Sequence, residues 1–135
     1  MKGINGELVG RWSLRLDAAY CAVLGIAVLV TAPALASAIA LPAAVIGGVG
    51  IAVVLWAAVV LWLLARLRLR SALRLVMAAN VAAAIGVAGV STVAATAFMV
   101  LTVLVIAVDV ALFAASQAFA LRSLSPAAGG QAPSA

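Results

Sequence analysis

A polar stripe interrupts the last long apolar stretch of the chain. Thr102, Asp109 and Ser116 follow one another at intervals of seven residues, so a helix places all three on one face. With a rise of about 1.5 Å per residue, Asp109 lies roughly 20 Å from Arg122, near the middle of a bilayer core about 30 Å thick. An ionised carboxylate at this depth costs about 3 kcal/mol. The stripe is therefore predicted to face other helices or a partner.

Asp109 supports two interpretations. In one, it is a proton or cation site of a transporter, because an acid within a membrane is a functional candidate by default. In the other, its side chain is a structural link that hydrogen-bonds a neighbouring helix. The absence of a line of polar partners in the sequence favours the structural link.

The remaining polar residues of the apolar stretches receive structural interpretations. Asn80 is predicted to form an interhelical hydrogen bond, at a depth different from that of Asp109. Asp17 is predicted to cap the first helix or to pair with Arg15, since the helix dipole favours a negative charge there. Gln117 lies near the end of its helix and is expected to reach polar headgroups.

The residue types do not indicate an enzyme or a metalloprotein. The chain has no histidine, which excludes imidazole ligation of haem or metals and histidine general bases. Cys21 is the only cysteine, so neither an intrachain disulfide nor a cysteine zinc site can form. No serine triad and no glycine-rich phosphate loop occur. We expect no catalytic residue, no cofactor and no metal.

The spacing of charges predicts the elements that position these residues. The intervals from Asp17 to Arg66 and from Arg74 to Arg122 are almost free of ionisable residues, and each accommodates two crossings of about 20 residues. Hydrophobic residues make up 69% of the chain, and the mean hydropathy of +1.39 lies outside the range of soluble domains. The prediction is an all-α membrane protein, an antiparallel four-helix transmembrane bundle.

The transmembrane domain is predicted over residues 17–122, after a cytoplasmic N-terminal segment, 1–16, and before a disordered cytoplasmic tail, 123–135. Its spans are expected at about 17–39, 43–65, 72–89 and 93–121. Pro33 is expected to kink or loosen the first helix, and Pro42 to precede the second. Ser91 or Thr92 is predicted to cap the fourth helix.

Basic residues predict the orientation in the membrane. They precede the first span, join the second to the third and follow the fourth: Lys2, Arg11, Arg15, Arg66, Arg68, Arg70, Arg74 and Arg122. The positive-inside rule then places both termini in the cytoplasm. The arginines that join the middle spans, Arg66, Arg68, Arg70 and Arg74, are also candidates for binding anionic lipid headgroups. Despite the net charge of +5, no nucleic-acid partner is expected, because no aromatic readers accompany the arginines.

The N-terminal region has a second interpretation. Arg11 and Arg15, the apolar residues 18–30 and the segment Ala34-Leu35-Ala36 have the outline of a secretory signal peptide with a cleavage site. Cleavage would leave three spans in the same orientation.

Small residues indicate close helix packing. Ala78, Ala82 and Gly86 recur every four residues, and three glycines cluster in the second span, namely Gly47, Gly48 and Gly50. Such positions let helix backbones approach closely in a membrane. They are explained either by packing within the chain or by a homodimer face.

Four short motifs carry a resemblance to a family. They are Leu14-Arg15-Leu16-Asp17, Ala40-Leu41-Pro42-Ala43, Gly48-Val49-Gly50 and Arg74-Leu75-Val76-Met77-Ala78-Ala79-Asn80. With these motifs the chain resembles uncharacterised small four-span integral membrane proteins of actinobacteria, from about Leu14 to Leu121. That family has no assigned activity, so the resemblance implies a bacterial membrane protein and transfers no functional residue.

Two functional hypotheses follow. The first is a structural or accessory membrane subunit, as a homodimer or within a larger membrane complex, in which Asp109 and Asn80 form assembly hydrogen bonds. The second is an oligomeric proton-coupled transporter of small solutes, in which Asp109 gains and loses a proton. Four helices enclose no wide path by themselves, so the transporter needs at least a dimer.

Overall fold

Four long helices make up the described part of the chain. The computed structural model describes residues 5–39, 41–93 and 96–124. The helices are α1 (Gly6–Ala38), α2 (Ala43–Arg66), α3 (Leu69–Val90) and α4 (Ala97–Ser123), with a short 3₁₀ turn, η1 (Ser91–Val93), after α3. Within those residues the structure contains no strand. The all-α four-helix fold predicted from the sequence is confirmed.

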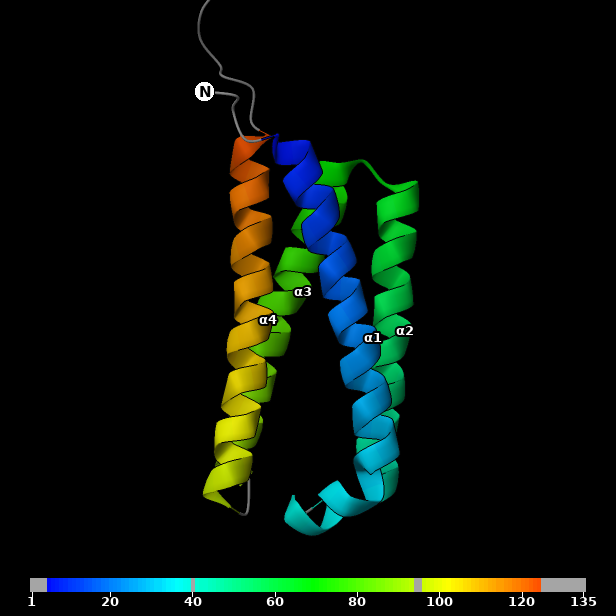
Figure 1. Ribbon diagram of the computed structural model, residues 1–135, viewed down its shortest axis with the longest axis vertical. Coiled ribbons are helices and arrows are strands. Elements are labelled where there is room, and N and C mark those ends of the chain that lie inside the picture. The colour runs from blue at the N-terminus through cyan, green and yellow to red at the C-terminus, as the bar shows by residue number, and fades with distance from the viewer. Residues whose placement is uncertain (1–4, 40, 94–95, 125–135) are drawn as a thin grey trace, which may run out of the picture.

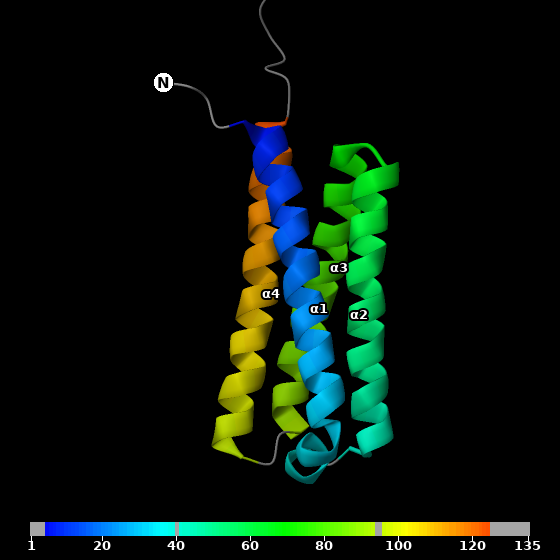
Figure 2. The same cartoon turned by 45° about the vertical axis from the view of Figure 1, so that its right-hand side comes forward.

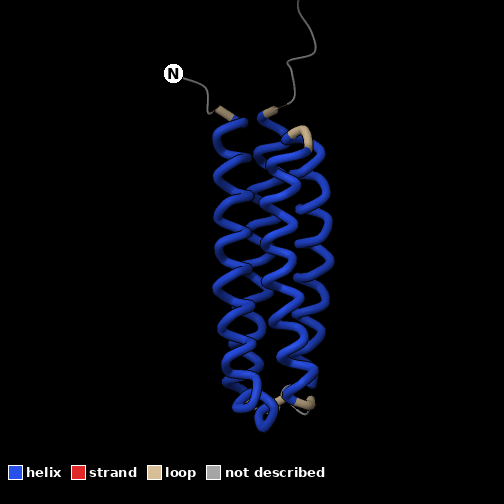
Figure 3. Tube along the Cα trace, turned by 90° about the vertical axis from the view of Figure 1, so that its right-hand side faces the viewer, coloured by secondary structure: helices blue, strands red, loops and turns tan. Residues whose placement is uncertain are grey.

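The helices are arranged as two antiparallel hairpins. α1 packs along α2, and α3 packs along α4 (Figures 1 and 2). The start of α1, the end of α4 and the connection from α2 to α3 lie at the same end of the molecule (Figure 1). We call this the terminal end, and the opposite one the distal end. The tube in Figure 3 shows the helices running nearly parallel to one axis.

The shared hydrophobic core lies in the half of the bundle next to the terminal end. All four helices contribute to it, through Leu14, Ala18, Cys21, Ala57, Val60, Leu63, Ala72, Leu73, Val76 and Ala120. Toward the distal end α1 and α4 diverge (Figure 1), and buried residues there, such as Ala32 with Ile46, belong to one hairpin. The two hairpins are therefore held together mainly in the terminal half.

A glycine pair brings α1 and α2 into backbone contact. A Cβ atom added to Gly25 would lie 2.7 Å from the carbonyl oxygen of Gly50, and one added to Gly50 would lie 2.7 Å from that of Gly25. No side chain fits at either position without movement of the backbone. The clustered glycines of the second span thus divide by role, because Gly50 lies at the helix crossing whereas nothing lies within 4 Å of a Cβ atom on Gly48.

The small-residue stripe of the third span lies on the outer face of α3. Ala78, Ala82 and Gly86 are exposed, and no described residue lies within 4 Å of a Cβ atom placed on Gly86. Packing within the described part of the chain therefore does not explain Gly86.

The helix ends differ in part from the predicted spans. α1 begins at Gly6, well before Asp17, because Asn5 caps it by accepting a hydrogen bond from the Glu7 amide at 3.2 Å and Glu7 pairs with Arg11 at 3.1 Å. The helix continues through Pro33 to Ala38, and its C-terminal end bends away from the line of the helix (Figure 1).

The predicted cap of the fourth helix is wrong. Thr96 caps α4 by accepting a hydrogen bond from the Met99 amide at 3.2 Å. The hydroxyls of Ser91 and Thr92 instead donate to the carbonyls of Ala88 and Gly89, which ties them to the end of α3. Residues 94–95 of the predicted fourth span lie outside the described residues, as do Lys2, Ala40 and most of the predicted tail.

The outer surface of the bundle is apolar. Each of the four helices contains a window long and apolar enough to cross a membrane, and only 17–28% of the residues in these windows are buried. Large side chains such as Val23, Val30 and Ile85 are about 70% exposed. Exposure of so much apolar surface to water would be unfavourable. The surface is instead compatible with a multi-pass protein in a lipid bilayer.

Candidate functional site

Asp17 lies at the centre of a buried hydrogen-bonded cluster. Its oxygen Oδ2 accepts one hydrogen bond from Asn80 Nδ2 at 2.7 Å and another from Gln117 Nε2 at 2.9 Å. The three residues belong to α1, α3 and α4, and none is more than 3% exposed. The cluster therefore joins three helices through a single carboxylate oxygen.

The position of Asp17 corrects the expectation of an interfacial cap. Because α1 begins at Gly6, Asp17 lies several turns inside the helix and faces the core. The salt bridge found among the described residues joins Arg11 to Glu7. Within those residues Asp17 forms no ion pair, either with Arg15 or with another cation. Amide donors, and at longer range the Cys21 thiol at 3.7 Å, compensate the carboxyl group instead.

Gln117 was expected to reach headgroups, and this expectation is also wrong. Its side chain is completely buried. Gln117 donates to Asp17, and its Oε1 atom accepts a long hydrogen bond from Asn80 Nδ2 at 3.5 Å. The amide is held inside the bundle because α1 and α3 pack over this face of α4.

Two serine hydroxyls meet on the terminal side of the Asp17 cluster. Ser13 Oγ and Ser116 Oγ are 2.6 Å apart, and Ser116 also donates to the carbonyl of Phe113 at 2.8 Å. The Ser13–Ser116 contact links α1 to α4, so it joins the two hairpins.

On the distal side of the cluster, Tyr20 donates a hydrogen bond to Asp109 Oδ2 at 3.1 Å. The Tyr20 ring packs against Phe113 at a centroid distance of 5.4 Å and an interplanar angle of 52°. Asp109 and Tyr20 are both half-buried. Asp109 thus has a partner on the other hairpin and keeps part of its surface accessible.

These three groups of contacts follow one another along the bundle, and we call them together the polar seam. It consists of Ser13, Asp17 and Tyr20 on α1, of Asp109, Ser116 and Gln117 on α4, and of Asn80 on α3. The three α1 residues are spaced by four and three positions, which aligns them on one helix face. Within the described residues, no buried side-chain nitrogen or oxygen atom lacks a hydrogen-bond partner.

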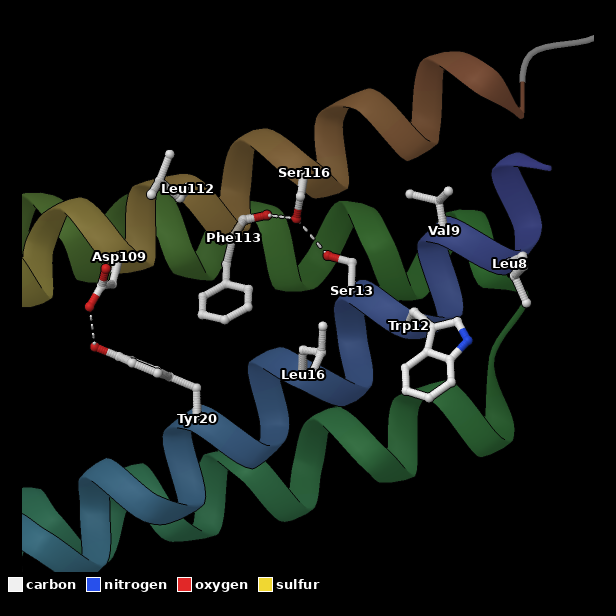
Figure 4. Close-up of a pocket in the computed structure, with 10 residues that line it drawn as sticks. All are labelled: Leu8, Val9, Trp12, Ser13, Leu16, Tyr20, Asp109, Leu112, Phe113 and Ser116. Atoms are coloured by element: carbon white, nitrogen blue, oxygen red, sulfur yellow. Dashed lines mark hydrogen bonds between the residues drawn. The ribbon is translucent and has the colours of Figure 1, made fainter. Parts of the chain in front are cut away.

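An open groove runs along the seam between α1 and α4 (Figure 4). It has a volume of about 600 Å³ and is lined by Leu8, Val9, Trp12, Ser13, Leu16, Tyr20, Asp109, Leu112, Phe113 and Ser116. Tyr20 and Asp109 lie at one end and Leu8 at the other (Figure 4). The polar part of the groove consists of the hydroxyls of Ser13, Tyr20 and Ser116 and the carboxyl group of Asp109. Apolar and aromatic side chains form the rest.

The candidate residues chosen from the sequence separate into different environments. Asp109 and Ser116 both lie in the seam and line the groove, whereas Thr102, partly buried on the same helix, does not line it. Asn80 bonds to Asp17 and Gln117. Ser13 and Tyr20 do not stand out in the sequence, and Asp17 is predicted there to be a cap; the spacing of these three residues by four and three positions could have revealed their shared face.

The arginines around the connection from α2 to α3 lie near the terminal end. Arg66, Arg68, Arg70 and Arg74 are exposed. Arg70 also donates a hydrogen bond to the carbonyl of Leu124, so it caps the C-terminal end of α4 as well as carrying charge. Capping by a cation is favourable there because of the helix dipole.

The chemistry available at the seam is hydrogen bonding and proton exchange. Two carboxyl groups, one phenol and two serine hydroxyls are present. The part of the chain that the structure describes holds no group of three His, Cys, Asp or Glu side chains placed to bind a metal ion. Cys21 is a buried free thiol, and a serine pair without a base is not an activated nucleophile.

Comparisons of the chain with protein-family models, with curated proteins and with solved structures find no match.

Proposed function

We propose that the protein is a non-enzymatic structural or accessory subunit of a bacterial inner membrane. The observation that carries this proposal is the reciprocal pairing along the polar seam. Asp17 takes two amide donors, Ser13 meets Ser116, and Asp109 accepts from Tyr20. Side chains that hydrogen-bond one another across the two hairpins hold the helices together. This structural role agrees with the modest strength of interhelical hydrogen bonds in membranes.

In this proposal the terminal end faces the cytoplasm. Supporting it, the helix ends that carry arginines all meet there (Figure 1), as the positive-inside rule requires of a cytoplasmic face. The exposed arginines, Arg66, Arg68 and Arg74 with the capping Arg70, would also attract anionic headgroups, at about 1 kcal/mol per charge near the surface.

The experiment that tests the subunit role has two parts. Tagged protein is extracted from its native membrane in polymer-bounded lipid particles, and the stoichiometry is measured by native mass spectrometry. We expect a defined complex, either of two or more copies or with a second membrane protein. The purified chain in proteoliposomes that enclose a pH-sensitive dye is expected to dissipate a pH gradient no faster than empty liposomes.

A proton-coupled carrier is the second candidate, because Asp109 is half-buried and borders an open groove. This candidate predicts proton entry into the proteoliposomes and loss of that flux in Asp109→Asn. It also requires at least a dimer, so a monomer in mild detergent would count against it. Proton flux that depends on Asp109 would replace the subunit proposal.

A further inference from the structure

The groove between α1 and α4 combines one acid with several aromatic rings. Asp109 is the acidic residue among its lining side chains, which include Trp12, Tyr20 and Phe113 but no lysine or arginine. Its volume of about 600 Å³ falls within the range of roughly 300–1,000 Å³ that is typical of sites for small molecules. The charge and the lining both suit a positively charged apolar molecule.

A lipid acyl chain is a poor match for this lining. The Tyr20 hydroxyl donates to Oδ2 of Asp109, and a carboxyl group accepts several hydrogen bonds, so Asp109 can take a further polar partner. Hydrocarbon against this half-buried carboxyl group would offer it no such partner. A cationic group at the same position would pair with it.

We propose that this groove binds a lipophilic organic cation. The positive charge pairs with the Asp109 carboxylate, and the apolar body packs against the groove walls. Aromatic faces add to the attraction, since the rings of Tyr20 and Phe113 adjoin the acid (Figure 4) and aromatic faces attract cations. The binding is non-covalent, and it goes beyond the subunit role, which it neither requires nor excludes.

The ligand has a direct route into the groove. Leu8, Trp12, Leu16 and Leu112 line it and are each more than half exposed. These side chains lie on the outer surface that faces lipid, so the groove opens laterally. A lipophilic cation already concentrates in the bilayer and would enter along the membrane plane.

The test uses two ions of nearly identical shape and opposite charge. The full-length protein is placed in phosphatidylcholine nanodiscs, and binding of tetraphenylphosphonium and of tetraphenylborate is measured by equilibrium dialysis against empty nanodiscs. We expect saturable binding of the cation, at least about tenfold tighter than that of the anion, and an approximately tenfold or larger loss of cation affinity in Asp109→Asn.

A matched control separates this site from the overall charge. Glu7→Gln removes one negative charge from an exposed side chain that does not line the groove. The affinity of this variant for tetraphenylphosphonium should stay within about twofold of the wild-type value. Leu112→Trp narrows the groove without changing a polar group and should weaken binding of the cation. Thermal unfolding of each variant establishes that it is folded.

Equal affinity for the two ions, or unchanged affinity in Asp109→Asn, would overturn the proposal and indicate an ordinary lipid-filled groove. If Asp109→Asn does not fold, Leu112→Trp decides, since unchanged binding in that variant places the cation elsewhere. The measurement reports equilibrium binding and neither proton flux nor assembly, so a negative result leaves the subunit proposal untouched.

Discussion

At the scale of single residues, Asp17 Oδ2 is the atom on which the two hairpins converge. Asn80 and Gln117 both donate to it, and the oxygen has almost no access to solvent, because Asp17 is 1% exposed. Removal of either amide leaves a buried carboxyl group with one donor fewer. A buried polar group that loses a partner costs more than an average hydrogen bond contributes.

Asn80→Ala and Gln117→Ala should each lower the free energy of unfolding by about 1–2 kcal/mol. The double variant should deviate from additivity, because both amides serve the same oxygen. The measurement is unfolding by sodium dodecyl sulfate in mixed micelles, followed by circular dichroism. Ser37→Ala is the control, since Ser37 is exposed and its hydroxyl bonds within its own helix. A loss in Ser37→Ala equal to that in Asn80→Ala would contradict the prediction.

Residue types alone singled out Asp109, Ser116 and Asn80, because polar side chains are conspicuous in apolar stretches. Their partners could not be assigned in the same way, since pairing depends on how each helix is rotated and how far it extends. The sequence predicts an interfacial Asp17 because the charge boundary indicates the start of the first span there. In the structure the helix starts earlier, and the core covers that position.

At the scale of the helices, the contact within the α1–α2 hairpin differs from the contact between the hairpins. α1 and α2 meet through the backbone at Gly25 and Gly50, whereas side-chain hydrogen bonds and the shared hydrophobic core join the two hairpins. At the Gly25–Gly50 crossing, the close approach of α1 and α2 therefore depends on the absence of side chains. Such close approach is a common source of helix association in membranes.

Gly25→Ala should destabilise the protein by about 1–3 kcal/mol, because the added methyl group would overlap the carbonyl of Gly50 and push the helices apart. Gly48→Ala should be neutral or stabilising by up to about 1 kcal/mol, since it meets nothing within 4 Å and gains helix propensity. Thermal unfolding in dodecyl maltoside compares the two. Equal losses would show that the helices do not cross at Gly25.

Thr96→Ala should destabilise α4 by about 1 kcal/mol, because it removes the acceptor for the Met99 amide. Thr92→Ala should have a smaller effect, since the Thr92 hydroxyl only donates to a carbonyl of the preceding turn. Amide hydrogen exchange in the first turn of α4 measures the difference. Faster exchange in Thr92→Ala than in Thr96→Ala would show that Thr92, as predicted from the sequence, caps the fourth helix.

At the scale of the whole molecule, charge and hydropathy were sufficient to predict four helices, because the cost of polar groups in lipid acts on every residue of a span. The arrangement of the helices was beyond that reasoning. The stripe of Ala78, Ala82 and Gly86 illustrates why, since its spacing suits packing but the structure leaves it exposed. Alanine is abundant throughout this chain, and its spacing alone does not select a partner helix.

The proposed topology predicts which ends react with a membrane-impermeant maleimide. In a Cys21→Ala background, Thr92→Cys at the distal end should be labelled in intact cells. Ser71→Cys near the terminal end should be labelled only after the membrane is opened. Both positions are exposed, so the reagent's access is determined by the side of the membrane. Labelling of Ser71→Cys in intact cells would reverse the orientation.

The divergence of α1 and α4 toward the distal end has a mechanical consequence. The shared core and the Asp17 cluster join the hairpins in the terminal half, and from there α1 and α4 separate toward the distal end (Figure 1). The bundle therefore has the form of a hinge whose fixed point lies near its terminal end. A force applied at the distal helix ends acts on the angle between the hairpins with the longest lever arm.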